Sequence, residues 1–123
     1  MNVEALDNLD HFIGSDSFYR YSPLFPMLLT EGAKYLADNA DCYWLFDIVG
    51  SVLYPRILRG NRFLLARIKK FKTSRGAKFE LEDGNGKRLY VQRIDYTDFP
   101  LDSYEFYVIG NGTYWTAMLK SEY

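Results

Sequence analysis

The chain has one histidine and one cysteine, and these are the first side chains to consider for catalysis. His11 follows Asp7 and Asp10, which a helix would bring within reach of its imidazole, and a carboxylate can orient and charge such a ring. A general base also needs a substrate pocket and a nucleophile, and one histidine at a helix end is more typical of a cap or a surface residue. We therefore do not expect His11 to be catalytic.

Cys42 falls in the first turn of a predicted helix, where the helix dipole would lower the pKa of a thiol. The only imidazole that could serve it as a base is His11, and Tyr43 and Trp44 follow it directly. We interpret Cys42 as a small buried side chain. Because a lone cysteine forms no internal disulfide, the sequence fits a reducing compartment, and we expect a cytoplasmic protein.

Metal-binding and phosphate-loop motifs are missing from the sequence. It has no paired histidines or cysteines, and Asp95, Asp98 and Asp102 lack the glycine-containing spacing of a calcium loop. The glycine pairs within 84–86 and 110–112 are interpreted as turns, because no helix follows them. We expect no metal, no cofactor and no enzymatic activity.

Length and composition indicate one globular domain spanning residues 1–123. Of the 123 residues, 48% are apolar and 25% charged, which excludes disordered and fibrous classes. The first ten residues hold three acids and no base, unlike a secretory signal. The longest uncharged stretch is the fourteen residues 106–119, shorter than the roughly 18 that cross a bilayer, so we expect no membrane association.

Charges are sorted along the chain into three blocks. Residues 1–47 hold eight acids against Arg20 and Lys34, residues 48–79 hold nine bases and no acid, and residues 80–123 hold eight acids against four bases. The formal net charge of −1 conceals this acidic, basic, acidic order. Surface charges of opposite sign usually intermix, so we expect the blocks to neutralise one another in the fold.

The basic segment, residues 56–78, is one candidate binding surface. Its cations could neutralise phosphates, and Phe63, Phe71 and Phe79 interleave with them as stacking rings do in single-strand binders. The same rings also fit a buried strand, and a pI near 5.8 gives no global attraction to nucleic acid. The candidate phosphate-binding residues are Arg56, Arg59, Arg62, Lys69, Lys70, Lys72 and Arg75.

The stretch 95–105, in which carboxylates mix with aromatic rings, is the second candidate. It joins two predicted strands, so we expect it at one end of a sheet. Such a mixture suits docking on a basic protein surface, with packing of the rings in the core as the alternative. The candidate residues, called here the acidic-aromatic surface, are Asp95, Tyr96, Asp98, Phe99 and Asp102.

Two helices are predicted in the first half of the chain. Thr30 is a suitable N-cap for an amphipathic helix over 31–39, and Asp41 for a second helix that Pro55 ends. A further short helix is expected within Val3–Ile13. The second helix has a wide apolar stripe that should be buried, formed by Trp44, Leu45, Ile48, Val49, Val52 and Leu53.

After Gly60 the pattern changes from helical spacing to alternation of apolar and charged residues, which is typical of strands. The five predicted strands are 63–71, 77–82, 87–96, 104–109 and 113–119. Short glycine-rich turns favour antiparallel pairing. We therefore predict an α+β fold, with a mainly helical layer from 1–59 on one face of a four- or five-stranded antiparallel meander from 60–123.

Five segments together resemble an uncharacterised family of small bacterial and phage proteins, a domain of unknown function. They are residues 11–20, 29–37, 43–48, 94–101 and 119–123, and the most distinctive are the Tyr-Trp-Leu and Tyr-Thr-Asp-Phe-Pro motifs. The segment from Arg56 to Gly76 lies outside them. The resemblance implies no catalytic residue. It implies a setting on phages and mobile elements, where compact inhibitors of host defence such as anti-CRISPR proteins are common.

Together these observations predict a non-enzymatic protein that binds a macromolecule. The first hypothesis is a phage or mobile-element inhibitor of a bacterial defence system, anti-CRISPR-like, that docks through the acidic-aromatic surface on a protein with a basic surface. The alternative is a nucleic-acid-binding accessory protein that uses the basic segment.

Overall fold

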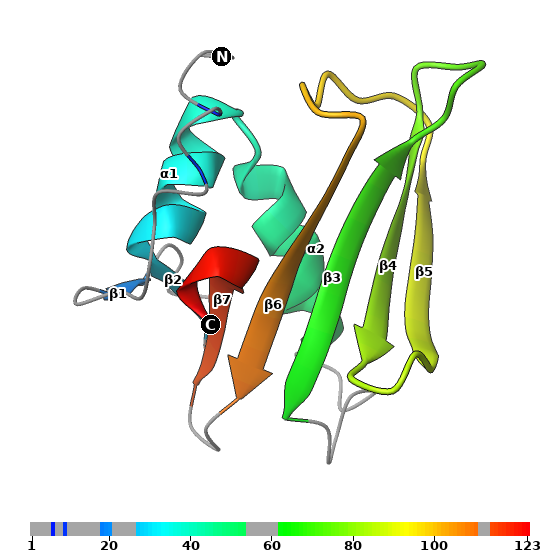
Figure 1. Cartoon of the computed structure of the whole chain (residues 1–123). Helices are drawn as coiled ribbons and strands as arrows, with labels where there is room; N and C mark the ends of the chain where they lie inside the picture. The colour runs from blue at the N-terminus through cyan, green and yellow to red at the C-terminus, as the bar shows by residue number, and fades with distance from the viewer. Residues whose placement is uncertain (1–5, 7–8, 10–17, 21–26, 54–61, 111–113) are drawn as a thin grey trace.

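The computed structural model describes residues 6, 9, 18–20, 27–53, 62–110 and 114–123 (Figure 1). In this part of the chain two α-helices accompany one seven-stranded sheet, with strand order β1-β2-β7-β6-β3-β4-β5. The elements are β1 Phe18–Arg20, β2 Met27–Thr30, α1 Glu31–Asn39, α2 Tyr43–Leu53, β3 Phe63–Lys70, β4 Ala77–Asp83, β5 Arg88–Ile94, β6 Ser103–Gly110, β7 Trp115–Leu119 and the 3₁₀ turn η3 Lys120–Glu122.

Both predicted helices are present. The hydroxyl of Thr30 accepts a hydrogen bond from the backbone N–H of Ala33 at 3.2 Å, which confirms the predicted N-cap of α1. The second helix begins at Tyr43, so the prediction of Asp41 as its N-cap is wrong. Asp41 instead has φ 50°, a left-handed conformation in the turn between the helices. Pro55 lies outside the described residues.

All five predicted strands are found, each within two residues of its expected bounds. The β4–β5 hairpin also turns as the sequence indicates. The carboxylate of Asp83 accepts hydrogen bonds from the backbone N–H groups of Asn85 and Lys87, both at 2.9 Å. Gly86 adopts φ +86°, which a residue with a side chain rarely does.

The predicted meander is wrong, because β6 does not follow β5 in space. β6 pairs with β3, on the side of β3 away from β4, so the order β6-β3-β4-β5 is a Greek key. The connection over residues 95–102 therefore passes across the ends of β4 and β3. Eight extended residues span up to about 26 Å, and three strand spacings are about 14 Å, so the connection is long enough.

The prediction of a mainly helical layer over 1–59 is also wrong in part. Residues 18–20 and 27–30 form β1 and β2, which extend the sheet to seven strands. β2 pairs in parallel with β7, with Leu29 opposite Ala117. Of the predicted helix at Val3–Ile13 only Leu6 and Leu9 are described, and both are buried in the core.

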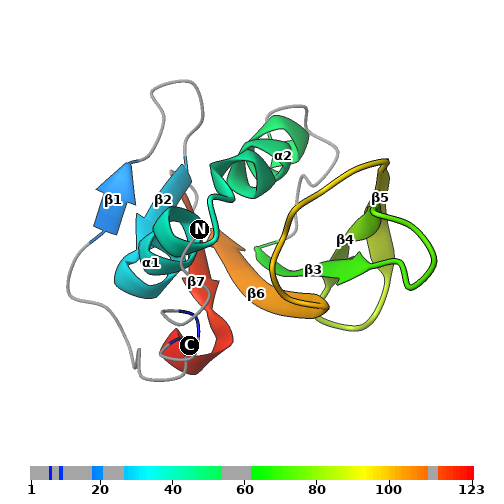
Figure 2. The same ribbon diagram turned by 90° about the horizontal axis from the view of Figure 1, so that it is seen from above.

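Both helices cover the same face of the sheet (Figure 2). Phe106 of β6 and Leu119 of β7 are register partners on that face. The ring of Phe46 in α2 lies 5.2 Å from the ring of Phe106, and Gly32 in α1 lies against the side chain of Leu119. The opposite face of the sheet, called here the open face, carries charged and half-buried residues of the same strands.

The apolar stripe of α2 is buried to different degrees. Leu45, Val49 and Val52 are buried, whereas Trp44, Ile48 and Leu53 are half-buried and pack against the core. The prediction that the whole stripe is buried is therefore wrong for Trp44, Ile48 and Leu53, although the burial of the other three makes α2 a core helix. Part of the Trp44 ring is exposed at the surface.

The C-terminal turn η3 is tied to the start of α1 by a buried carboxylate. Glu122 accepts hydrogen bonds from the hydroxyl of Thr30 at 2.6 Å and from the backbone N–H groups of Gly32 at 3.0 Å and Leu119 at 2.9 Å. A Cβ on Gly32 would lie 2.5 Å from an oxygen of Glu122, so only glycine permits this approach. We call this group the Glu122 clasp.

Candidate functional site

The two candidate surfaces meet at one end of the sheet (Figure 1). The basic loop 71–76 joins β3 to β4, and the acidic loop 95–102 joins β5 to β6. The backbone N–H of Thr97 donates to the carbonyl of Arg75 at 2.8 Å, and that of Lys70 donates to the carbonyl of Asp102 at 2.8 Å. The segments that the sequence separates by charge are therefore neighbours in space.

Part of the basic segment is neutralised inside the fold, as the charge blocks predict. Arg67 forms ion pairs with Glu82 and with Glu105, each at 2.6 Å, and these carboxylates belong to the neighbouring strands β4 and β6. Lys78 pairs with Glu80 at 2.8 Å. The carboxylates bound to Arg67 raise the pKa of its guanidinium, which keeps it charged.

The remaining candidate phosphate-binding residues do not converge on one stripe. Arg62 precedes β3, at the opposite end of the sheet from Lys72 and Arg75. Lys70 donates from Nζ to the carbonyl of Phe99 at 2.9 Å. Arg56 and Arg59 lie outside the described residues. Within the described chain, the exposed cations without a carboxylate inside 4.0 Å include Arg62, Lys69, Lys72 and Arg75.

The rings of the basic segment are also divided between core and surface. Phe79 is fully buried, whereas Phe71 stays half-buried with the guanidinium of Arg93 4.9 Å from its ring centre. Phe63 lies on the open face in a cluster with Tyr107 and Tyr123, with ring centres 4.9 to 5.7 Å apart. The stacking pattern suggested by the sequence is therefore not one continuous row.

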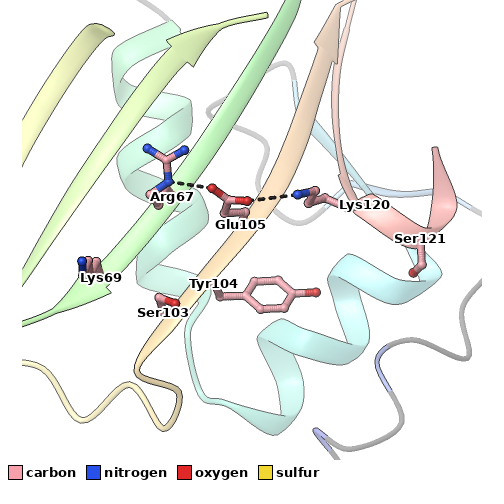
Figure 3. Close-up of a pocket in the computed structure, with 7 residues that line it drawn as sticks. All are labelled: Arg67, Lys69, Ser103, Tyr104, Glu105, Lys120 and Ser121. Carbon is pink, nitrogen blue, oxygen red and sulfur yellow. Dashed lines mark hydrogen bonds and ion pairs between the residues drawn. The ribbon is translucent and has the colours of Figure 1, made fainter. Parts of the chain in front are cut away.

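A hollow of about 480 Å³ opens beside β6 where β7 no longer pairs with it (Figure 3). Glu105 lies between Arg67 and Lys120, which bind it at 2.6 and 3.0 Å. These two cations hold the pKa of Glu105 below its usual range, the hydrogen bond from Arg67 having the larger effect. The hollow is lined by Arg67, Lys69, Ser103, Tyr104, Glu105, Lys120 and Ser121. Arg67 and Lys120 are therefore already paired, and Lys69 is the lining cation without a carboxylate within 4.0 Å among the described residues. The lining residues include no general base with a nucleophile.

The acidic-aromatic surface is exposed except at one residue. Asp95, Asp98 and Asp102 are exposed, and Tyr96 has 65% of its surface exposed. Phe99 is 1% exposed and belongs to the core, so this ring does not line the surface and instead anchors the loop. Of the two rings expected on this surface, Tyr96 is exposed beside the carboxylates and Phe99 is not.

A second, smaller hollow of about 220 Å³ lies under this loop. It is lined by Trp44, Ile94, Tyr96, Thr97 and Asp98. Sequence reasoning missed the part played by Trp44, because helical spacing placed it in the core. The ring becomes a wall of the hollow only because the 95–102 connection passes close to the start of α2, and the sequence carries no signal for that crossing.

The candidate catalytic side chains gain no support from the described structure. Cys42 is buried, burial raises the pKa of its thiol to about 12, and its Sγ contacts the carbonyl of Leu36 at 3.7 Å. His11 lies outside the described residues. Among the described residues, no group of three or more histidine, cysteine or acidic side chains is placed to hold a metal ion. Nor does any described helix have the length and apolar character needed to cross a membrane.

Comparison with known proteins identifies a family. A family model described as "Family of unknown function (DUF6876)" matches residues 3–123. Curated proteins and solved structures give no match. The family result agrees with the resemblance to an uncharacterised family. Because the match covers nearly the whole sequence, the chain belongs to the DUF6876 family, whose function is unknown.

Proposed function

We propose that this protein is a binding domain without enzymatic activity, and that it docks on a basic protein through the acidic-aromatic surface. One observation carries the proposal. Tyr96 holds 65% of its surface in solvent, directly beside Asp98 and above the hollow that Trp44 lines. Exposed aromatic side chains next to a pocket are typical of the residues that dominate binding energy in protein interfaces.

The charges around this ring favour a basic partner. In the described chain, neither Asp98 nor Asp102 has a cation within 4.0 Å. Asp95 has only an exposed pair with Arg93 at 3.3 Å, which contributes little.

Affinity capture followed by kinetics tests the proposal. The wild-type chain and the double variant Asp98→Lys with Asp102→Lys would each be used to capture partners from the host cell. With the purified partner, we expect the double variant to slow association at least tenfold and to change dissociation less, because exposed charges mainly steer encounter.

A control for added positive charge is available at the other end of the sheet. Asn85→Lys adds positive charge at an exposed turn residue between β4 and β5, and it should leave the association rate within twofold of the wild type. If the double variant bound the partner as fast as the wild type, or if Asn85→Lys slowed binding equally, the acidic-aromatic surface would not be the docking site.

The more specific form of the proposal names the partner as a component of a bacterial defence system, with the protein acting as an anti-CRISPR-like inhibitor from a phage or mobile element. It is supported by the resemblance set out above and by the small size of the domain. A plasmid-interference assay tests it: expression of the wild-type chain should restore plaque formation or plasmid uptake in a host whose defence system is active. Unchanged interference across defence types would contradict it.

A second candidate function is binding of single-stranded nucleic acid on the open face. It is favoured by the hollow with three cations next to the ring cluster of Phe63, Tyr107 and Tyr123, in which Lys120 lies 6.0 Å from the ring centre of Tyr107. Glu80, Glu82 and Glu105 on the same face offset these cations, and we expect weak binding near 150 mM salt.

Salt-dependent titration with an oligonucleotide separates the two candidates. If nucleic acid is the ligand, changing Lys69 and Lys120, two cations that line this hollow, to glutamate should abolish binding. The wild-type affinity should also fall steeply with salt because phosphate contacts release counterions. Submicromolar wild-type binding at 150 mM salt would place nucleic acid first. Binding weaker than about 100 μM would leave the protein partner as the better candidate.

A further inference from the structure

We propose that the hollow lined by Trp44, Ile94, Tyr96, Thr97 and Asp98 is a pocket for one arginine side chain of the partner. This inference rests on the proposed function and adds to it the chemical group that is recognised. We refer to the hollow as the arginine pocket.

Two aromatic walls give the pocket its affinity for cations. Trp44 comes from the first turn of α2 and Tyr96 from the 95–102 loop, so two separate elements supply the rings. The faces of tryptophan and tyrosine carry partial negative charge and attract a cation placed over them. Ile94 adds an apolar surface for the methylene groups of a long side chain.

One carboxylate completes the site. Asp98 is exposed and lines the pocket, and within the described residues no lysine or arginine lies within 4.0 Å of it. Arg93 instead has its guanidinium 4.9 Å from the ring centre of Phe71 and lies 3.3 Å from Asp95. The charge of Asp98 is therefore available to a cation from outside.

The size and chemistry of the pocket favour arginine over other ligands. Its volume of about 220 Å³ is below the range of typical small-molecule sites, roughly 300–1,000 Å³, and suits a single side chain. A guanidinium group is planar, so it stacks on rings and at the same time donates in a fork to a carboxylate. It is also more weakly hydrated than the ammonium group of lysine, so entering a ring-lined hollow costs it less.

The pocket is held in shape before any ligand binds. The backbone N–H of Thr97 donates to the carbonyl of Arg75 at 2.8 Å, and the hydroxyl of Thr97 accepts from the backbone N–H of Phe99 at 3.1 Å. The buried ring of Phe99 anchors the residue after Asp98 in the core. Tyr96 and Asp98 thus project from a fixed loop, which reduces the ordering cost of binding.

Trp44 provides a direct readout. The chain has two tryptophans, so the variant Trp115→Phe leaves Trp44 as the only source of tryptophan fluorescence. Titration of the full chain with N-acetyl-arginine methylamide should give a saturable change with a Kd on the order of 1–10 mM, as expected for one side chain. The shift of the Trp44 indole N–H resonance in the wild-type chain gives an independent measurement, in case Trp115→Phe disturbs the fold.

Two matched probes test the guanidinium group itself. N-acetyl-citrulline methylamide keeps the shape and loses the charge, and it should produce no saturable change. N-acetyl-lysine methylamide keeps the charge and loses the planar fork, and it should bind at least threefold more weakly. Equal binding of citrulline, or binding of lysine as tight as that of arginine, would overturn the proposal.

Variants test whether the arginine probe binds in this pocket. Asp98→Asn and Tyr96→Ala should each weaken the arginine probe at least fivefold, whereas Asp47→Asn, at an exposed aspartate of α2 outside the lining, should leave it within twofold. An equal loss in Asp47→Asn would indicate general charge attraction and contradict a pocket. The arginine probe binds without the partner, so the two proposals can fail separately. If the probe binds but Asp98→Lys leaves partner binding unchanged, only the proposed function is refuted. If the probe does not bind but Asp98→Lys weakens partner binding, only the pocket is refuted.

Discussion

The two faces of the sheet are built from the same strands and are held together differently. On β3, Leu64, Ala66 and Ile68 point to the helices and are fully buried, while Arg67 between them points to the open face and joins two carboxylates. The covered face depends on volume and close packing, and the open face on ion pairs at partly exposed positions. Substitutions on the covered face should therefore cost far more stability than substitutions on the open face.

The largest effect is expected for Phe106→Ala on the covered face. Phe106 is fully buried against Phe46, so its removal should lower the free energy of unfolding by about 3–5 kcal/mol, through lost transfer energy and a cavity. Urea unfolding monitored by circular dichroism measures it. Tyr107→Ala, one residue along on the open face, is the matched control and should cost less than half as much. Equal costs would contradict the contrast between the faces.

The next largest effect is expected at the Glu122 clasp. Glu122→Ala removes the acceptor from the Thr30 hydroxyl and from two backbone N–H groups, and unpaired buried donors should cost about 2–3 kcal/mol. Glu122→Gln retains one acceptor oxygen and should lie between wild type and Glu122→Ala. Ser121→Ala changes an exposed neighbour and should melt as the wild type does. A Glu122→Ala melt unchanged from wild type would show that the clasp contributes no stability.

A smaller effect is expected for the ion pairs of the open face. Arg67→Met leaves Glu82 and Glu105 without their shared partner, and the loss of stability should be about 1 kcal/mol, since these side chains are partly exposed. Lys69→Met, on the same strand and face without a carboxylate within 4.0 Å in the described chain, is the control and should change stability by less than about 0.5 kcal/mol. A loss as large as that of Phe106→Ala would remove the distinction between the faces.

Local patterns in the sequence are enough to predict most of the helices and strands and which of their residues are buried. Alternation from Phe63 onward places five strands within two residues of their observed ends, and Thr30 marks the start of α1. These signals are read within a few neighbouring residues. β1 and β2 are three and four residues long, too short for a period to be recognised, and were missed for that reason.

Contacts between distant segments account for what the sequence did not predict. The position of β6 beside β3 depends on how far the 95–102 connection reaches, and its composition does not encode that. Glu122 is a buried acid only because Thr30 and Gly32, about 90 residues earlier, supply its donors. Trp44 lines a pocket through the same crossing loop. The sequence drew attention to Tyr96 and Asp98 but not to Trp44, which lines the same pocket.

The smallest expected effect is the contribution of Glu105, on the open face, to the pH dependence of stability. Hydrogen bonds and charge from Arg67, and then from Lys120, hold the pKa of Glu105 below its usual value near 4.5. A carboxyl group whose pKa is lower in the folded state stabilises the fold above its unfolded pKa, and this contribution disappears as the pH falls through the folded value. Stability should therefore decline between about pH 5 and pH 3, and more gently in Glu105→Gln, which has no such group to protonate. Urea unfolding at pH 6, 4.5 and 3 measures the two slopes. Identical slopes in the two proteins would show that the ion pairs of Arg67 and Lys120 with Glu105 do not stabilise the open face.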